Sequence, residues 1–348
     1  MNPLLGIFYH AAGGFAAGSF YIPYKRVNNW AWEVYWLLGG FFAWIIMPLT
    51  ISGFAVPDLM AFLSDIPEKF MVWPYIFGFL WGIGGLTFGL TMRYLGMSLG
   101  MALALGLTAS FGTLVPPVYF DQFGELLAHT SGLVTLGGVA VCLIGISLTG
   151  RAGMLKDKEQ SKEEKQKHIA EFNFKKGVLV AVLAGVMSAC FAFGIAAGKP
   201  IAEMAVAYGT PVLFSNSASF IFIMAGGFTT NLIWCVFLGI KNKTIGDFIK
   251  IKNTPVLNNY IFSALAGITW YFQFMFYGMG STKMGEYDFA SWTIHMAFII
   301  VFSNIWGLVL KEWTGSSKKV ILTIFFGLLV LVFSTAIIGF GNYIQQFE

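Results

Sequence analysis

Long apolar runs recur along this chain, and they constrain its fold more than any other feature. Stretches of about 20 residues, nearly free of charged side chains, follow one another through the sequence. Inside a bilayer every backbone N–H and C=O needs a partner within the protein, so only helices or a closed barrel can cross it. The runs are continuous and lack the alternating pattern of barrel strands. The chain is therefore predicted to be an all-α, polytopic membrane protein.

Composition excludes several functional classes. Hydrophobic residues make up 57% of the chain and charged residues 11%, whereas about a quarter of a soluble domain is charged. A soluble enzyme and a nucleic-acid binder are therefore excluded. No Walker A, H-E-x-x-H or G-x-S-x-G motif is present, and Cys142, Cys190 and Cys235 lie inside apolar runs. We expect no enzyme activity, no catalytic residues, no metal, no cofactor and no use of ATP.

Ten membrane spans can be counted, five on each side of one long polar segment. That segment, residues 151–175, is too highly charged to be buried and is interpreted as a solvated linker. It separates a first five-helix unit, residues 1–150, from a second, residues 176–348. The expected spans are Leu4–Tyr24, Trp30–Ser52, Phe70–Tyr94, Met97–Phe120, Thr130–Gly150, Lys176–Ala197, Val212–Ile240, Val256–Gly280, Phe289–Leu310 and Val320–Gly341.

Basic residues lie mainly in alternate connections, and this gives the chain an orientation. If the N-terminus is placed outside, only Lys69, Lys199 and Lys283 fall in outer segments, which leaves 18 of the 21 Lys and Arg residues in inner ones. Both termini are therefore predicted outside and the linker inside. The net charge of +4 is then an insertion signal, so no acidic partner is inferred from it.

An odd number of spans per half predicts that the second half enters the membrane inverted relative to the first. A shift of 185 residues places Tyr75–Ile83 on Tyr260–Ile268 with six of nine residues identical. The same shift places Gly100 on Gly285. Two inverted five-helix repeats are typical of secondary transporters, in which the substrate site lies near the middle of the membrane.

Glycines spaced four residues apart predict close contacts between helices. The pairs Gly14…Gly18 and Gly78…Gly82 have this spacing. Such small faces let helix backbones approach each other in lipid.

Candidates for carrying a proton are few. Every carboxylate lies near the end of a span or in a loop, Glu33 among them, whereas His10 and His295 lie several residues inside spans. Histidine titrates near neutral pH, which suits proton coupling. We therefore predict His295 as the proton carrier, with Glu33 and His10 as further candidates; the alternative for each histidine is a neutral residue that packs between helices.

Aromatic and amide side chains occur together inside the spans, a combination that suits a neutral sugar. Amides can bond its hydroxyl groups, and aromatic rings can cover the apolar face of its ring. Trp270 and Gln273 share one helix face, and a buried amide is costly unless it is paired. We instead interpret the tryptophans close to span ends as residues of the membrane–water interface; these are Trp30, Trp32, Trp36 and Trp313. The predicted substrate-binding residues are Trp81, Trp270, Gln273, Trp292 and Asn216.

Several stretches resemble one bacterial family. They are Phe20–Lys25, Trp30–Glu33, Trp81–Gly84, Gly89–Ser98, Arg151–Gly153, Glu171–Asn173, Lys175–Gly177, Trp270–Tyr271, Gln273–Phe274, Ser291–Trp292, His295–Met296 and Gly307–Trp313. In these stretches, which extend over nearly the whole chain, the sequence is similar to the L-rhamnose–proton symporters of the drug/metabolite transporter superfamily. Two departures stand out: Gly85-Leu86 follows Trp81–Gly84 where the family has a polar Asn, and Phe214–Ser217 replaces an expected Pro-Ser-Tyr stretch.

The resemblance implies uptake of L-rhamnose, or a related 6-deoxyhexose, with protons across the bacterial inner membrane by alternating access. Both termini would then be periplasmic and the linker cytoplasmic. The family's fold places Trp81, Gln273 and His295 toward a central cavity. The partners expected are a small sugar, protons and the lipid bilayer. The alternatives are a metabolite exporter or exchanger of the same superfamily, a sodium-coupled sugar transporter, and a membrane enzyme or receptor that binds a sugar without moving it.

Overall fold

The prediction of an all-α fold is confirmed. A computed structural model describes residues 2–95, 97–119, 121, 123–159, 173–249, 254–285, 289–311 and 313–348, and every regular element in these ranges is a helix. Seven helical stretches in this part of the chain are long and apolar enough to cross a membrane, and a shorter apolar helix covers Leu103–Val118. The seven are Trp32–Ala55, Glu68–Thr91, Thr130–Lys156, Lys175–Ala207, Val212–Asn242, Ala290–Val309 and Lys318–Phe347.

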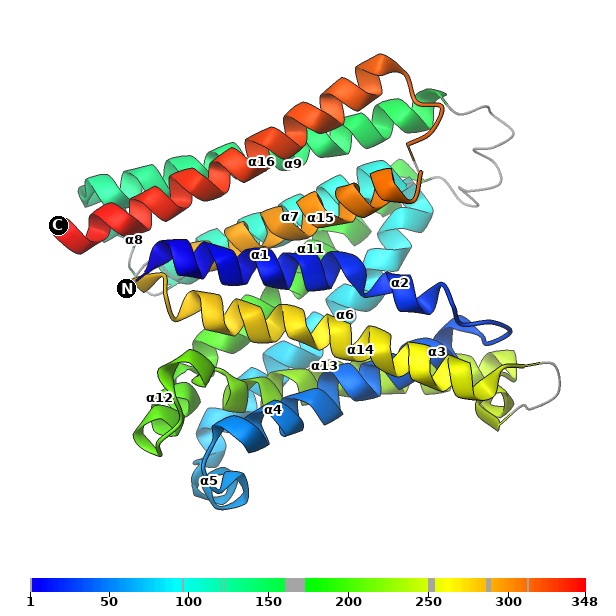
Figure 1. Cartoon of the computed structure of the whole chain (residues 1–348), viewed down its shortest axis with the longest axis horizontal. Helices are drawn as coiled ribbons and strands as arrows, with labels where there is room; N and C mark the ends of the chain where they lie inside the picture. The colour runs from blue at the N-terminus through cyan, green and yellow to red at the C-terminus, as the bar shows by residue number, and fades with distance from the viewer. Residues whose placement is uncertain are drawn as a thin grey trace. The chain divides into compact units, whose positions relative to one another are not determined.

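The described helices are shown in Figure 1. In chain order they are α1 (Pro3–Ser19), α2 (Tyr21–Tyr24), α3 (Trp32–Phe41), η1 (Phe42–Ile46), α4 (Met47–Ala55), α5 (Leu59–Asp65), α6 (Glu68–Leu95), α7 (Met97–Tyr119), α8 (Phe123–Ala128), α9 (Thr130–Glu159), α11 (Phe174–Ala197), α12 (Lys199–Ala207), η2 (Val212–Phe214), α13 (Ser217–Asn242), η3 (Ile245–Ile249), α14 (Val256–Ser281), α15 (Ala290–Val309), α16 (Lys318–Ile344) and η5 (Gln345–Phe347).

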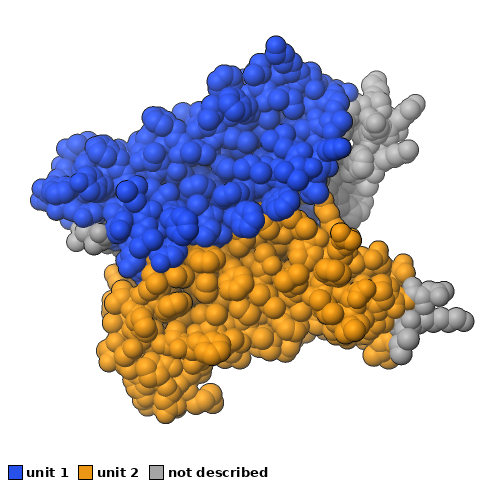
Figure 2. All heavy atoms as spheres, in the orientation of Figure 1, with its two compact units in different colours: residues 1–15, 84–192, 280–348 blue, residues 16–83, 193–279 orange. Residues whose placement is uncertain are grey.

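The chain forms two compact units, coloured separately in Figure 2. Unit 1 comprises residues 1–15, 84–192 and 280–348. Unit 2 comprises residues 16–83 and 193–279. Each unit therefore takes segments from both halves of the sequence.

The expected linker begins as helix. Helix α9 continues through Arg151 to Glu159, so the membrane span passes directly into a charged helical extension. Lys156 and Lys158 lie in its last turn, where basic side chains interact favourably with the helix dipole. Residues 160–172 of the linker lie outside the described residues.

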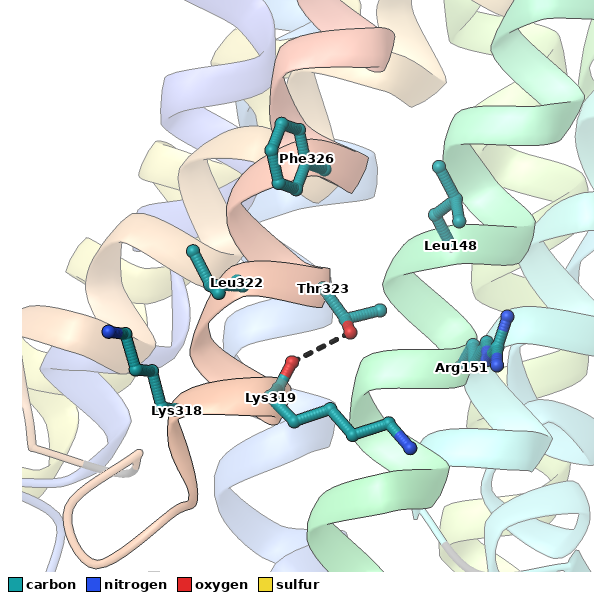
Figure 3. A pocket seen from close by; sticks show the side chains of 7 residues that line it. All are labelled: Leu148, Arg151, Lys318, Lys319, Leu322, Thr323 and Phe326. Carbon is teal, nitrogen blue, oxygen red and sulfur yellow. Dashed lines mark hydrogen bonds between the residues drawn. The ribbon is translucent and has the colours of Figure 1, made fainter.

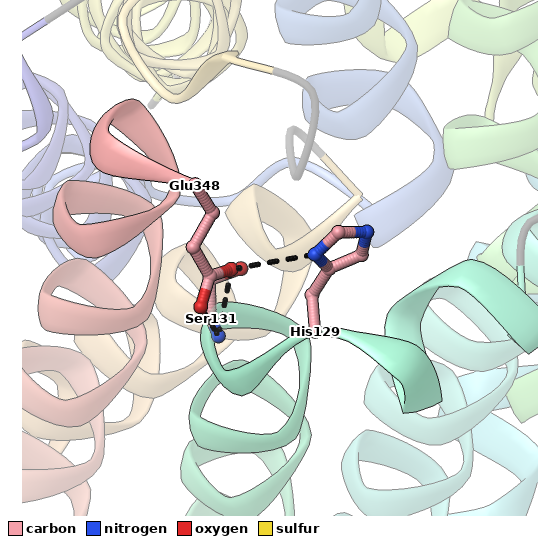
Figure 4. Close-up of polar contacts among 3 residues, drawn as sticks. All are labelled: His129, Ser131 and Glu348. Atoms are coloured by element: carbon pink, nitrogen blue, oxygen red, sulfur yellow. Dashed lines mark hydrogen bonds and ion pairs between the residues drawn. The ribbon is translucent and has the colours of Figure 1, made fainter.

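In unit 1 the helices α9 and α16 pack along each other in opposite directions (Figure 1). At one end Glu348 accepts hydrogen bonds from the backbone N–H and hydroxyl of Ser131, and its carboxylate lies 3.8 Å from Nδ1 of His129 (Figure 4). At the other end Glu159 accepts hydrogen bonds from the backbone N–H and hydroxyl of Ser317, the N-cap of α16. The two helices are therefore held at both ends by a glutamate–serine contact.

In unit 2 the helix α13 packs against α3 and α4, and glycines let it approach α6. A Cβ atom on Gly78 would lie 2.0 Å from the carbonyl oxygen of Ile223, and one on Gly226 would lie 2.1 Å from that of Tyr75. No larger side chain fits at either position without moving a backbone. The close packing predicted for Gly78 is therefore present between these two helices.

Candidate functional site

The predicted site residues divide between the two units. His10, Trp292 and His295 belong to unit 1. Five belong to unit 2: Glu33, Trp81, Asn216, Trp270 and Gln273. The division separates the predicted histidines from most of the predicted sugar-binding residues.

Two buried histidines meet inside unit 1. Helix α1 carries His10 and α15 carries His295; their side chains are 0% and 1% exposed. Their ring centroids lie 6.0 Å apart in an edge-to-face arrangement. Gly280 makes room for this contact, because a Cβ atom there would lie 2.7 Å from Cε1 of His10. The sequence predicted each histidine separately, and the fold brings them together as one histidine pair.

Trp292 lies one helical turn before His295 and is anchored by its surroundings. Its indole N–H donates to the carbonyl oxygen of Thr108 at 3.0 Å, and its ring stacks on Phe191 with centroids 5.8 Å apart. Gly112 leaves space for the indole, since a Cβ atom there would lie 2.4 Å from Nε1. These contacts fix Trp292 as part of the packing around the histidine pair.

Four tryptophans of unit 2 form a continuous aromatic group, which we call the tryptophan cluster: Trp36, Trp44, Trp81 and Trp270. The ring centroid of Trp270 lies 5.1 Å from that of Trp36 and 5.2 Å from that of Trp44. Trp44 also meets Trp81 edge to face at 6.0 Å. Offset and edge-to-face rings at such spacings attract one another beyond their simple burial. The cluster thus brings together Trp81 and Trp270, two of the predicted sugar-binding residues.

Trp44 is the member of the cluster that the sequence analysis missed. It lies in η1, a π-helical turn in which the Met47 N–H bonds back to the Phe42 carbonyl. Pro48 explains this turn, because it has no N–H to donate to the Trp44 carbonyl four residues earlier. Single π-helical turns are frequent at functional sites. In the sequence, the signal for this π-helical turn was Pro48, which follows Trp44 by four residues inside an expected span.

Polar atoms in the cluster differ in whether they are paired. The indole N–H of Trp36 donates to the Asn231 side chain at 3.0 Å. In the part of the chain that the structure describes, the buried indole N–H of Trp44 has no hydrogen-bond partner. The Gln273 side chain is 5% exposed, and its amide makes no hydrogen bond to the described part of the chain. Leaving a buried donor such as the Trp44 N–H unpaired costs about 1–3 kcal/mol.

The interface position expected for Trp36 is wrong. Its side chain is only 8% exposed and is hydrogen-bonded inside unit 2. The physical reason is Asn231, which offers the indole N–H a buried partner inside unit 2. Closeness to the end of a span was therefore a poor guide to its environment.

Asn216 is the residue that precedes α13. Its side-chain amide donates to the carbonyl oxygen of Gly278 at 3.3 Å. It lines a small pocket of about 10 Å³ together with Ser217 and Tyr271, a volume close to that of one water molecule. In this position Asn216 joins the start of α13 to the end of α14.

Glu33 is held in a polar network at the start of α3. Its carboxylate oxygen accepts hydrogen bonds from the Asn242 amide at 3.0 Å and from the Thr244 hydroxyl at 2.7 Å. The side chain is 6% exposed. Two donors stabilise the carboxylate, and they tie the end of α13 to α3.

Comparison with known proteins shows that the chain matches one family over nearly its whole length. The family model described as L-rhamnose-proton symport protein (RhaT) matches residues 2–343. An L-rhamnose-proton symporter of Yersinia pestis (strain Pestoides F) is 39% identical over 341 residues, which cover 97% of this chain and 98% of the relative. An L-rhamnose-proton symporter of Citrobacter koseri is 38% identical over 340 residues, or 97% of each chain.

Proposed function

Because this chain belongs to the L-rhamnose-proton symport protein family, we propose that it carries L-rhamnose into the cell together with protons. The observation that carries this proposal is the family match, which extends over residues 2–343. The protein is a multi-pass membrane transporter and not an enzyme. A proton gradient then supplies the energy for uptake.

Sugar recognition is assigned to the tryptophan cluster and Gln273. A 6-deoxyhexose presents hydroxyl groups together with a methyl group and an apolar ring face. The rings of Trp81 and Trp270 suit that apolar face. The unpaired N–H of Trp44 and the unpaired amide of Gln273 suit the hydroxyl groups. The other two predicted residues, Asn216 and Trp292, already donate to backbone carbonyls, and we keep them as further candidates for contact with the sugar.

Proton binding is assigned to the histidine pair. Ionisable groups inside membrane spans are functional candidates by default, and His10 and His295 are both buried. Two cationic rings with centroids 6.0 Å apart would repel each other, so the pair accommodates one added proton at a time. His295 is proposed as the carrier and His10 as its partner. Glu33 is the second candidate, and its two hydrogen-bond donors suit a carboxylate that stays charged.

The proposed architecture is ten spans in two inverted repeats, residues 1–150 and 176–348, joined by a cytoplasmic linker at 151–175. The composition of the compact units supports it. Unit 2 contains residues 16–83 of the first repeat and 193–279 of the second. Each segment runs from the end of the repeat's first span through its second span into its third. Equivalent pieces of both halves are thus used in the same unit, as expected for repeats that act by alternating access.

The proposed membrane is the bacterial inner membrane, with both termini in the periplasm. The distribution of Lys and Arg supports this orientation, because 18 of the 21 fall in inner segments when Lys69, Lys199 and Lys283 are outside. The charged end of α9, with Lys156 and Lys158, then faces the cytoplasm.

The direct test is uptake of labelled L-rhamnose into cells that produce the protein, with and without a protonophore. We expect accumulation that disappears when the proton gradient is dissipated and is unaffected when sodium is replaced by choline. Loss of uptake on sodium replacement would instead indicate a sodium-coupled transporter. Uptake that ignores both gradients but rises when the opposite side is preloaded with sugar would indicate an exchanger. Cells carrying an empty vector provide the baseline.

A further inference from the structure

A basic pocket lies where α9 and α16 run side by side near the charged end of α9 (Figure 3). Its volume is about 490 Å³, and every residue that lines it belongs to unit 1. Three of these residues are cationic: Arg151, Lys318 and Lys319. The pocket contains none of the residues proposed for sugar or proton binding.

The charged side chains that line the pocket in the described part of the chain are all basic. Lys319 extends from α16 toward α9, which carries Arg151 (Figure 3). Among the described residues, no carboxylate lines the pocket. The neighbouring carboxylate is Glu159, which interacts electrostatically with Lys319 but is already engaged by the Ser317 N–H and hydroxyl. The N-terminal end of α16 adds its partial positive charge to the same region.

Apolar side chains continue from the cations into the membrane span. Lys318, Leu322 and Phe326 follow one another at i, i+4 and i+8 on α16, so they share one helix face. Leu322 and Phe326 are 44% and 55% exposed. On α9 the pocket is lined by Leu148, three residues before Arg151. A positively charged end is therefore followed by an exposed apolar track of about two helical turns.

We propose that this pocket binds an anionic phospholipid, whose phosphate lies between Arg151 and Lys319 and whose acyl chain covers Leu322 and Phe326. Basic pockets between transmembrane helices on the cytoplasmic side are suited to anionic headgroups. The assignment to the cytoplasmic leaflet follows from the proposed orientation, whereas the binding itself depends only on the pocket. The lipid would bridge α9 and α16 at the end where Glu159 and Ser317 already hold them together.

The apolar track decides between a lipid and a soluble anion. Free phosphate would gain from the three cations but not from Leu148, Leu322 or Phe326. A phospholipid satisfies both parts, because its charged and apolar portions are joined in the same order as the side chains along α16. The span that contains this end of α16, Lys318–Phe347, is one of the helices apolar enough to lie in a membrane.

The test is binding of short-chain phosphatidylglycerol to the full-length protein in an uncharged detergent, followed by native mass spectrometry. The double variant Arg151→Gln/Lys319→Gln should bind about 30-fold more weakly, since each basic side chain near an anionic headgroup contributes roughly a fivefold factor. The charge-preserving variant Arg151→Lys/Lys319→Arg should bind like the wild type. The single variant Lys319→Gln replaces one exposed side chain and should bind the lipid about fivefold more weakly. It keeps the test available if the double variant does not fold.

Lys175→Gln/Lys176→Gln is the matched control, because it removes two exposed charges from the first turn of α11 in the same unit and leaves the pocket intact. It should bind phosphatidylglycerol like the wild type. An equal loss in this control, or equal binding of zwitterionic phosphatidylcholine by the wild type, would overturn the proposal. Competition by inorganic phosphate or glycerol phosphate at the same concentrations as the lipid would also overturn it, in favour of a soluble-anion site.

Discussion

The indole N–H groups of Trp292 in unit 1 and Trp44 in unit 2 differ in their hydrogen bonding, although both side chains are buried. In unit 1 the Trp292 N–H is paired with the Thr108 carbonyl, and neighbouring hydroxyls pair with each other, as Thr113 and Thr293 do at 2.6 Å. In unit 2 the Trp44 N–H has no hydrogen-bond partner among the described residues, and the Gln273 amide likewise makes no hydrogen bond to them. Because an unpaired buried donor is costly, this difference supports the proposal that Trp44 leaves a hydrogen bond for the sugar.

From this difference we infer that the two units have different tasks in the proposed symporter, one in proton binding and the other in sugar binding. The histidine pair in unit 1 offers the titratable groups, and the tryptophan cluster with Gln273 in unit 2 offers the sugar contacts. If the division is real, substitutions in one unit should change proton coupling and substitutions in the other should change sugar affinity.

The largest effect is expected for His295→Gln, which keeps a polar side chain but removes the titratable ring. Accumulation of L-rhamnose against its gradient should fall to equality of inside and outside concentrations, because no proton is then carried with the sugar. Labelled uptake in energised cells measures this. His10→Gln is the comparison and should weaken coupling less. Accumulation by His295→Gln at the wild-type level would assign the histidine a packing role only.

Gln273→Leu should have the next largest effect, this time on affinity. Losing one hydrogen bond to a sugar hydroxyl should raise the half-saturation concentration of uptake about tenfold. Asn231→Leu is the matched control, because its amide is already bonded to Trp36 and to the Gly227 carbonyl. The control should lower stability by about 1–3 kcal/mol through the orphaned indole N–H. If Gln273→Leu leaves the half-saturation concentration unchanged, as the control Asn231→Leu should, then Gln273 has no role in recognition.

A smaller effect is expected when Trp44 or Trp292 is replaced. The indole N–H of Trp292 is hydrogen-bonded, whereas that of Trp44 has no partner among the described residues. Trp44→Phe removes an N–H that has no hydrogen-bond partner among the described residues, so it should cost less stability than Trp292→Phe, while the half-saturation concentration increases about fivefold. Trp292→Phe should do the reverse and cost about 1–3 kcal/mol by orphaning the Thr108 carbonyl. Thermal unfolding in detergent and uptake kinetics together distinguish them. Identical behaviour of the two variants would refute the contrast between the units.

How much of this picture could be predicted depends on whether a feature is local. The apolar runs predicted the helices because burial in lipid demands a long apolar segment whatever its neighbours are. The sequence also found Trp81, Trp270, Gln273 and the two histidines, since each is unusual inside an apolar run. It could not place Trp36 or find Trp44, because their pairing depends on Asn231 and on the turn before Pro48. Such contacts arise only when distant helices meet.

The smallest effect concerns the contact that closes one end of α9 and α16 in unit 1 (Figure 4). The Ser131 hydroxyl donates to Glu348 and holds the pKa of that carboxyl below its ordinary value of 4.5. A lowered pKa in the folded state means that the contact stabilises the protein above about pH 4.5 and that its contribution is lost as the pH falls through the folded-state pKa. Thermal unfolding between pH 7 and pH 3 should therefore show a small stability loss on acidification that Ser131→Ala lacks. A parallel pH dependence in both proteins would remove this role from the contact.

The central claim is that sugar binding in unit 2 is linked to proton binding at the histidine pair in unit 1. Linked sites affect each other reciprocally, so the most direct measurement is the equilibrium affinity for L-rhamnose as a function of pH in three purified proteins. The wild type should bind more tightly as the pH falls and protons are supplied. His295→Gln should still bind the sugar but with an affinity that no longer changes with pH, whereas Gln273→Leu should bind weakly and keep the wild-type dependence on pH. An unchanged pH dependence in His295→Gln would contradict the account.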